Sequence, residues 1–311
     1  MQYFKVIDSD NNRPFDASRF LSFLRRSNDH WWDNKTRSSP WVFRGVGDAD
    51  SWKLLPAAWR PGNKNKLLPL LEQIKKLEYP QNPQSWMNNQ FGKDAFLWAN
   101  AECEAIYQFS HLANSNGHHI DDIGGSPILE GNLFGLNGDV IIHNIYNAPL
   151  AQHHGIPTRL LDWTNNPLFA AYFAASPRYR NNTASNICVW ALHCRNIEKI
   201  VAINNDSHGR VQIHNQPSYK NNYLHAQQGL FTEIRGGEGY YSIHGKWPSL
   251  EDILDEKYIH RPESPLLIQI RLTIEQVPRL MTLLDREGIN EAALMPSMDN
   301  ITQTLLDRWS Y

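Results

Sequence analysis

Two short segments, far apart in the chain, combine polar side chains with aromatic ones and are the strongest candidates for a functional site. Residues 41–45 read Trp-Val-Phe-Arg-Gly, so Arg44 stands at the end of a short β-prone run. Residues 152–164 read Gln-His-His-Gly-Ile-Pro-Thr-Arg-Leu-Leu-Asp-Trp-Thr. A guanidinium presents a planar fork of donors that suits a phosphate or a carboxylate. The two segments therefore predict a site for an anionic ligand.

The alternative to ligand binding by Arg44 is a structural role, in which Arg44 forms a salt bridge to Asp162 or Glu104. We favour ligand binding by Arg44. The glycine that follows it, Gly45, would let the backbone of a ligand approach closely. Asp162 stands between two apolar residues and is expected to be partly buried. A buried carboxylate needs partners, and Arg44 and Arg159 are the obvious ones. We therefore expect Asp162 to hold the local structure rather than to react.

Adjacent histidines, His153 and His154, invite a metal interpretation, but adjacent side chains on a helix diverge and seldom share one ion. No His-Glu-x-x-His pattern is present. Cys188 and Cys194 are too few for a zinc site without nearby histidines. We expect no metal, and we expect His154 to be a hydrogen-bonding residue at a helix end.

Glu291 is the most interesting carboxylate of the second half. It follows a helix stop at Gly288 and precedes the apolar run 292–295, which predicts a half-buried glutamate at the start of a strand. Such a group can have a raised pKa and act in catalysis. The alternative is a glutamate in a surface turn.

For three further side chains the sequence allows either a role in ligand binding or a structural role. Gln227 could hydrogen-bond a ligand amide, or it could belong to a strand that enters a turn. Trp163 and Tyr172 abut an apolar helix, so we expect them in the core more than in a stacking surface.

The composition limits the class of protein. The chain has 311 residues, 41% of them hydrophobic, and a formal charge of −2, so no global positive field exists to hold nucleic acid. Its three cysteines do not form a disulfide framework, and this favours a reducing compartment. The N-terminus lacks the features of a signal peptide, and no apolar run is long enough to span a membrane. We expect a cytoplasmic protein without membrane contact.

Periodicity predicts the elements that must position these residues. Helices are expected at 15–26, 64–77, 94–114, 140–154, 166–175, 277–286 and 302–309, and strands at 41–43, 186–192, 231–234 and 266–273. No linker divides the chain. We therefore expect one α+β domain over residues 1–311, with a small mixed sheet as its core, flanking helices and a mainly helical insertion at 64–147.

Several blocks of the chain resemble the FRG domain family, which takes its name from the Phe-Arg-Gly tripeptide at 43–45. The long block 152–164 is the most specific of them. The resemblance runs from about residue 41 to 300, although Met295 stands where the family usually has an aromatic residue. The other matching positions are 52–56, Arg60, Glu104, Phe109, 226–232 and 288–296.

A weaker, fold-level similarity connects the order Arg44, Thr164, Glu291 with arginine-type ADP-ribosyltransferases. It implies that Arg44 holds the diphosphate of NAD, that Thr164 supports the nicotinamide ribose, that Trp163 faces the nicotinamide, and that Glu291 binds the ribose 2′-hydroxyl. NAD would then be a substrate. The chain departs from that pattern, because it has no Ser-Thr-Ser triplet and no Gln/Glu-x-Glu setting. Further candidate contacts to NAD are His154, Arg159, Tyr172 and Gln227.

These resemblances imply an effector of the toxin or phage-defence type. Such a protein would modify a macromolecular target, protein or nucleic acid, and could have a regulatory or antitoxin partner. The alternative is a non-catalytic module that binds a nucleotide, a phosphate or a nucleic acid. Metal-dependent hydrolysis is a third hypothesis, which rests only on the His and Asp tracts.

Overall fold

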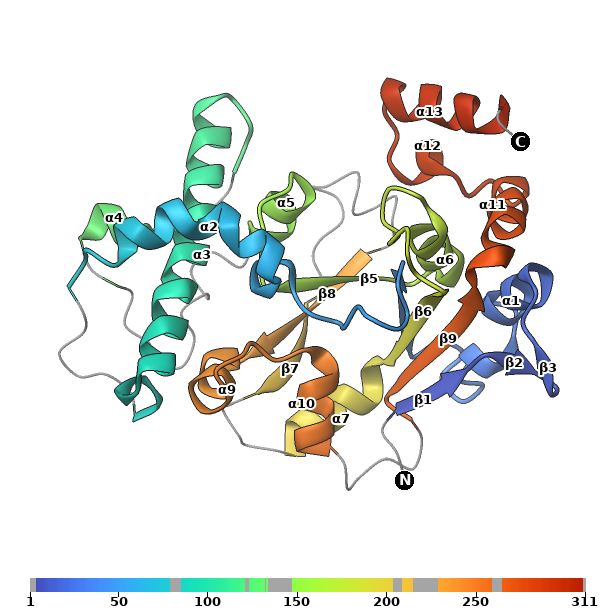
Figure 1. The fold of residues 1–311 in the computed structure, drawn as a ribbon, viewed down its shortest axis with the longest axis horizontal. Helices are drawn as coiled ribbons and strands as arrows, with labels where there is room; N and C mark the ends of the chain where they lie inside the picture. Colours follow the sequence, from blue (N-terminus) through green and yellow to red (C-terminus); the bar gives the residue numbers. More distant parts are fainter. Residues whose placement is uncertain are drawn as a thin grey trace.

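The computed structural model describes residues 4–78, 85–120, 123–131, 133, 147–203, 209–214, 229–258 and 265–309. Over these residues the fold is mixed α+β, as expected, and Figure 1 shows a central sheet with helices around it. Within the described ranges, the sheet contains seven strands in the order β1-β9-β6-β4-β5-β8-β7. Their bounds are β1 Phe4–Ile7, β4 Trp41–Val46, β5 Leu160–Thr164, β6 Asn186–His193, β7 Arg210–His214, β8 Gly229–Arg235 and β9 Leu267–Thr273.

The strand β6 explains how the sheet separates two cores. Its side chains alternate between the two faces, as the two-residue period of a strand requires. Ile187, Val189 and Ala191 enter one hydrophobic cluster, and the residues between them enter the other. β1 pairs with β9 in parallel, and the other neighbours in the sheet are antiparallel. A two-stranded ribbon, β2 Ser9–Asp10 and β3 Arg13–Pro14, follows β1.

Helices cover both faces of the sheet. The helices α1 (Ala17–Leu24), α6 (Pro167–Ala175) and α11 (Val277–Arg286) pack on the face of Ile187. The opposite face carries α7 (Cys194–Ile203), α9 (Gly237–His244) and α10 (Leu250–Tyr258), which lie together below the sheet in Figure 1. Short 3-10 helices complete these layers at η1 Asp29–Trp31, η2 Ala57–Trp59 and η5 Ile274–Gln276.

A helical group stands beside the sheet, in the region where we expected an insertion (Figure 1). It consists of α2 (Pro61–Ile74), η3 (Ser85–Asn88), α3 (Gln90–Ser115) and α4 (Pro127–Glu130). α3 begins four residues before the predicted start, because the Asn89 side chain caps it by accepting from the backbone N–H of Gly92. A separate cluster of buried apolar residues joins α2 to α3.

The C-terminal segment corrects one prediction. Glu291 does not begin a strand; it opens α12 (Glu291–Leu294), because the Asn290 side chain accepts from the backbone N–H of Ala293 and caps a helix. α13 (Met298–Trp309) follows and begins four residues before the predicted segment. Of the helix expected at 140–154, the structure has α5 (Ala148–His153), and residues 140–146 lie outside the described part. The strands β1, β5 and β7 and the ribbon of β2 and β3 were not predicted.

None of the helices in the described ranges is both long enough and apolar enough to cross a membrane.

Candidate functional site

A cavity of about 920 Å³ lies where the sheet splits between β4 and β5. These strands share one register pair, Phe43 with Thr164, and then separate. In a continued antiparallel ladder, Asp162 would lie opposite Gly45, but at Asp162 β5 keeps only the pairing with β8 along its other edge. The edge of β4 beyond Phe43 therefore faces an open space, and Arg44 projects from this edge.

Where the ladder of backbone hydrogen bonds between β4 and β5 ends, the Arg44 guanidinium connects the two strands. Its Nη1 donates to the backbone carbonyl of Asp162 at 2.8 Å and to the Asp162 carboxylate at 3.0 Å. The Arg44 side chain is 17% exposed and that of Asp162 is 53% exposed. The alternative of a salt bridge to Asp162 is therefore realised, but the expectation of a partly buried Asp162 was wrong: the carboxylate lies at the mouth of the cavity.

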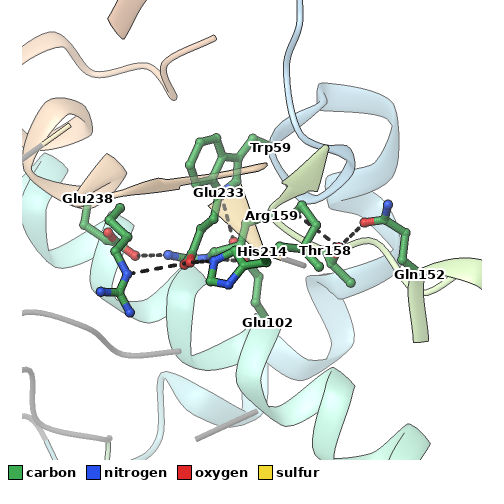
Figure 2. A network of polar contacts seen from close by, with 10 residues as sticks. Trp59, Glu102, Gln152, Thr158, Arg159, His214, Glu233 and Glu238 are labelled. Carbon is green, nitrogen blue, oxygen red and sulfur yellow. Dashed lines mark hydrogen bonds and ion pairs between the residues drawn. The ribbon is translucent and has the colours of Figure 1, made fainter. Parts of the chain in front are cut away.

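The side chain of Gln152, in α5, also holds the Asp162 carboxylate. Its side-chain amide donates to the Asp162 carboxylate, and the Thr158 hydroxyl donates to its carbonyl oxygen, a contact drawn in Figure 2. Thr158 is completely buried. This chain of contacts fixes Gln152, Thr158 and Asp162 of the 152–164 block relative to one another.

Arg60 brings a second guanidinium to the cavity from the start of α2. Its Nε donates to the carbonyl of Leu55 at 2.8 Å, which leaves the terminal nitrogens on the cavity side. Burial and the positive charge of Arg44 lower the pKa of Arg60 to about 10, whereas Asp162 opposes this shift. Two guanidiniums thus share one exposed carboxylate. Lys53 also lines the cavity and pairs with Asp252 at 3.0 Å.

Two further cations line the cavity from the segment after the end of α6. Arg178 pairs with Glu291 at 2.9 Å and lies over the ring of Tyr179. Arg180 forms an isolated bridge with Gly47. Its Nε is buried, and no hydrogen-bond partner for it lies among the described residues. Glu291 itself does not line the cavity; it stands behind Arg178.

A glycine is needed at position 45 for a different reason from the one we predicted. A Cβ at this position would lie 1.9 Å from the carbonyl oxygen of Ala170 and 2.6 Å from the backbone nitrogen of Ala174. The backbone that approaches Gly45 is therefore that of α6, not that of a ligand. The glycine lets α6 pack directly on β4 and so fixes the position of Arg44 next to it.

Arg159, a predicted ligand contact, lies in the interior (Figure 2). Its Nε donates to Glu102 at 3.0 Å and its Nη1 to Glu238 at 2.8 Å, and all three side chains are buried. The Trp59 indole donates to the same Glu102 carboxylate at 3.0 Å. Glu233, paired with His214 at 2.9 Å, adds a further negative charge near Arg159. Burial raises the pKa of Glu102 despite these cations.

The other predicted residues are divided between the cavity and the core. Thr164 lines the cavity beside Arg44. Trp163 contributes to the wall, but its indole is buried and donates to Thr232 at 2.9 Å. Tyr172 is in the core, as expected, and its neighbour Phe173 lines the cavity instead.

His154 ends α5 as its C-cap, which agrees with a helix-end position, and its ring stacks on Phe109 at 5.9 Å between centroids. His153, not His154, lines the cavity. Gln227 lies outside the described residues. No group of three His, Cys, Asp or Glu side chains suited to a metal ion occurs in the described ranges.

Sequence reasoning did not include Lys53, Arg60, Arg178 and Arg180 among the site residues. Of these, Arg60 carried a signal, because it belongs to the blocks that resemble a known family. The apolar part of the wall comes from side chains of several segments, among them Trp52, Phe173 and Met295. The cavity thus combines five basic side chains with one carboxylate and an apolar surface, which suits a ligand that has both anionic and flat apolar parts.

Comparison with known proteins gives one match. The model of the FRG domain matches residues 138–183, a stretch that contains α5, β5 and α6 and supplies Gln152, Asp162, Thr164, Arg178 and Arg180. The match supports the resemblance to the FRG family in this stretch; the Phe-Arg-Gly tripeptide and the blocks after residue 183 lie outside it. No curated protein and no solved structure matches the chain.

Proposed function

We propose that the FRG-type segment and β4 together form a binding site for a phosphorylated ligand of the nucleotide class. The observation that carries this proposal is the pair Arg44 and Arg60, two largely buried guanidiniums that line one cavity, where Asp162 pairs with Arg44 and is the only carboxylate among the described lining residues. Buried positive charges without full compensation are costly, so an anion that bridges them is stabilised.

The size and lining of the cavity favour a nucleotide over a free phosphate. Its volume of about 920 Å³ lies within the range of sites for small organic ligands, which is roughly 300–1,000 Å³. Phe173 and Met295, which are half-buried, and Trp52, which is 43% exposed, offer apolar surface to a base or a ribose, and the arginines stand where phosphates would be needed. NAD combines a diphosphate with two flat rings and is the first ligand to test.

Calorimetric titration with NAD, ADP and pyrophosphate tests the binding. Replacing Arg44 with Ala removes charge-assisted hydrogen bonds, so affinity should fall roughly 10- to 100-fold. Arg195→Ala is a matched control, because Arg195 pairs with Asp33 at 2.7 Å and does not line the cavity. Equal affinity in Arg44→Ala and Arg195→Ala, or no binding of any of the three ligands, would reject the proposal.

A second candidate is NAD-dependent ADP-ribosyl transfer at the same site. It is favoured by one observation: Arg44 and Thr164, which the ADP-ribosyltransferase analogy assigns to one site, both line the cavity. In this reaction the bond between ribose C1′ and nicotinamide breaks, and nicotinamide leaves with the bonding pair. A nucleophile of a protein or nucleic-acid target bonds to C1′ and loses its proton. A carboxylate near the oxocarbenium-like state would stabilise it.

The two carboxylates near the cavity have different access to this chemistry. Asp162 lines the cavity, and Glu291 is held behind Arg178. Incubation of the protein with labelled NAD in cell lysates, phage-infected ones included, measures nicotinamide release and transfer of ADP-ribose. Loss of turnover in Glu291→Gln with NAD binding retained would support the enzyme. Binding of NAD without turnover in any lysate would leave the binding module as the function and remove the expectation of a toxin or defence effector.

A further inference from the structure

The cations of the cavity form two groups on different segments. Arg44 and Arg60 make the first group, near Asp162. Arg178 and Arg180 make the second group, in the segment between α6 and β6. Both groups line the same cavity, so a ligand that fills it meets both.

The strand register gives the separation of the two groups. Arg180 is bridged to Gly47, which lies three residues beyond Arg44 along the same stretch of chain. With roughly 3.3 Å per residue of extended chain, the two backbone positions are about 10 Å apart. At this backbone separation the two groups of arginines can contact different phosphates of one ligand.

The charge of Arg180 is not neutralised by an ion pair within the described ranges, and this residue lines the cavity. The Nε of Arg180 is buried without a hydrogen-bond partner in the described part of the chain, and a buried unsatisfied donor of a charged group is costly. Arg178 has Glu291 as its partner, and its side chain is 62% exposed. Phe173 and Met295 add apolar side chains to the wall of the same cavity.

We propose that the cavity takes a nucleotide with two separate phosphate groups, one held by Arg44 and Arg60 and the other by Arg178 and Arg180. This inference rests on the proposed nucleotide binding and specifies the ligand further. NADP, which has a phosphate on a ribose in addition to its diphosphate, is of this class, and so is adenosine 3′,5′-bisphosphate. NAD and AMP are the matched ligands that lack the second phosphate.

The test compares each pair of ligands by calorimetry on the wild-type protein and on Arg180→Gln. A second phosphate that forms charge-assisted contacts should improve affinity roughly 10-fold or more, so NADP should bind tighter than NAD, and adenosine 3′,5′-bisphosphate tighter than AMP. Arg180→Gln should remove this preference and leave the affinity for NAD within about twofold, since each retained contact is unchanged. Arg178→Gln, at an exposed position, repeats the test should Arg180→Gln fail to fold, and Arg195→Gln is the control.

The outcomes separate the two proposals. Equal affinity of NAD and NADP in the wild-type protein overturns the two-phosphate ligand and leaves the nucleotide site in place. An equal loss for both ligands in Arg180→Gln also overturns it, because the arginine would then act on the shared part of the ligand. If none of the four nucleotides binds, the nucleotide site and the two-phosphate ligand are both rejected.

Discussion

Arg159 donates to Glu102 at 3.0 Å in a part of the molecule that water does not reach, where their side chains are 4% and 2% exposed. Glu102 belongs to α3 and Arg159 directly precedes β5, so this ion pair ties the helical group to the sheet next to the cavity (Figure 2). Glu238 of α9 completes the contact from a third element. The residue that looked like a ligand contact thus holds three elements together.

Replacing Arg159 with Met should lower the free energy of unfolding by about 3–5 kcal/mol, because the carboxylates of Glu102 and Glu238 would stay buried without their cation. Denaturation by urea measures this change. Arg178→Met is the control: its ion pair with Glu291 is largely exposed on the arginine side and should contribute no more than about 1 kcal/mol. Equal stability of the two variants would contradict the structural role of Arg159.

Gly45→Ala should prevent normal packing of α6 on β4. The new Cβ would lie 1.9 Å from the Ala170 carbonyl oxygen, and backbone at both sides must move to relieve this contact. We expect a loss of about 3 kcal/mol or more, or insoluble protein, since overpacking against backbone has no flexible side chain to absorb it. Gly62→Ala is the matched control, because nothing lies within 4 Å of a Cβ there and α2 would gain about 0.5–1 kcal/mol. Thermal unfolding distinguishes the two variants, and a native-like Gly45→Ala protein would show that α6 can shift freely.

The local signals of the sequence explain which elements were predictable. The prediction for α11 was confirmed at 277–286, because a strongly amphipathic run begins with proline near its first turn and ends before Gly288. β6 and β9 have apolar residues on both faces, a pattern typical of buried central strands. β7 at the edge of the sheet has a short run with one buried residue, Val211, and carries little signal.

The cavity was predictable only in part. Arg44 and Thr164 were found from residue type and setting, and the structure brings both to the wall. The split of the sheet depends on where β5 leaves β4, and no local pattern encodes such a tertiary event. For the same reason Arg178 and Arg180 could not be assigned, since their arrival beside Gly47 depends on how the chain returns after α6.

The attachment of α13 should weaken in acid, because an ion pair is one of the contacts that hold this helix. Arg308 of α13 donates to Asp285 at 2.8 and 2.9 Å, and chiefly this contact lowers the pKa of Asp285 below its ordinary value of 3.8. The contact therefore stabilises the folded state fully above pH 3.8 and is lost as pH falls through the lowered pKa. Amide hydrogen exchange of residues 298–309, corrected for the intrinsic rate, should accelerate in this range.

Asp285→Asn supplies the control for this pH effect. It should make the exchange of 298–309 fast already at neutral pH and remove its dependence on acid, because the asparagine carries no charge to attract Arg308. Exchange that stays slow in both the variant and the acidified protein would show that the apolar contacts of α12 and α13 suffice.

Asp162→Asn should increase the affinity of the cavity for anions. Asp162 now holds Nη1 of Arg44, at 3.0 Å, in the position that a phosphate oxygen would take, and its side chain is exposed enough to leave. A ligand that must first displace it binds with an affinity reduced by the fraction of molecules in the open state. Removing a partly exposed ion pair is worth up to about 1 kcal/mol, so we expect a gain of roughly fivefold. Asp50→Asn, which breaks the similar pair with Arg271 away from the cavity, should leave the affinity unchanged.

Two phosphate esters distinguish displacement from simple repulsion in Asp162→Asn. Methyl phosphate carries close to two negative charges well above its second pKa of about 6, and dimethyl phosphate carries one. If Asp162 must leave Arg44 before either ligand binds, both affinities should rise by nearly the same factor, since the same contact is broken each time. If Asp162 stays in place and only repels the ligand, the logarithm of the gain should be about twice as large for methyl phosphate. A fall in both affinities would mean that Asp162 positions Arg44 for the ligand instead of competing with it.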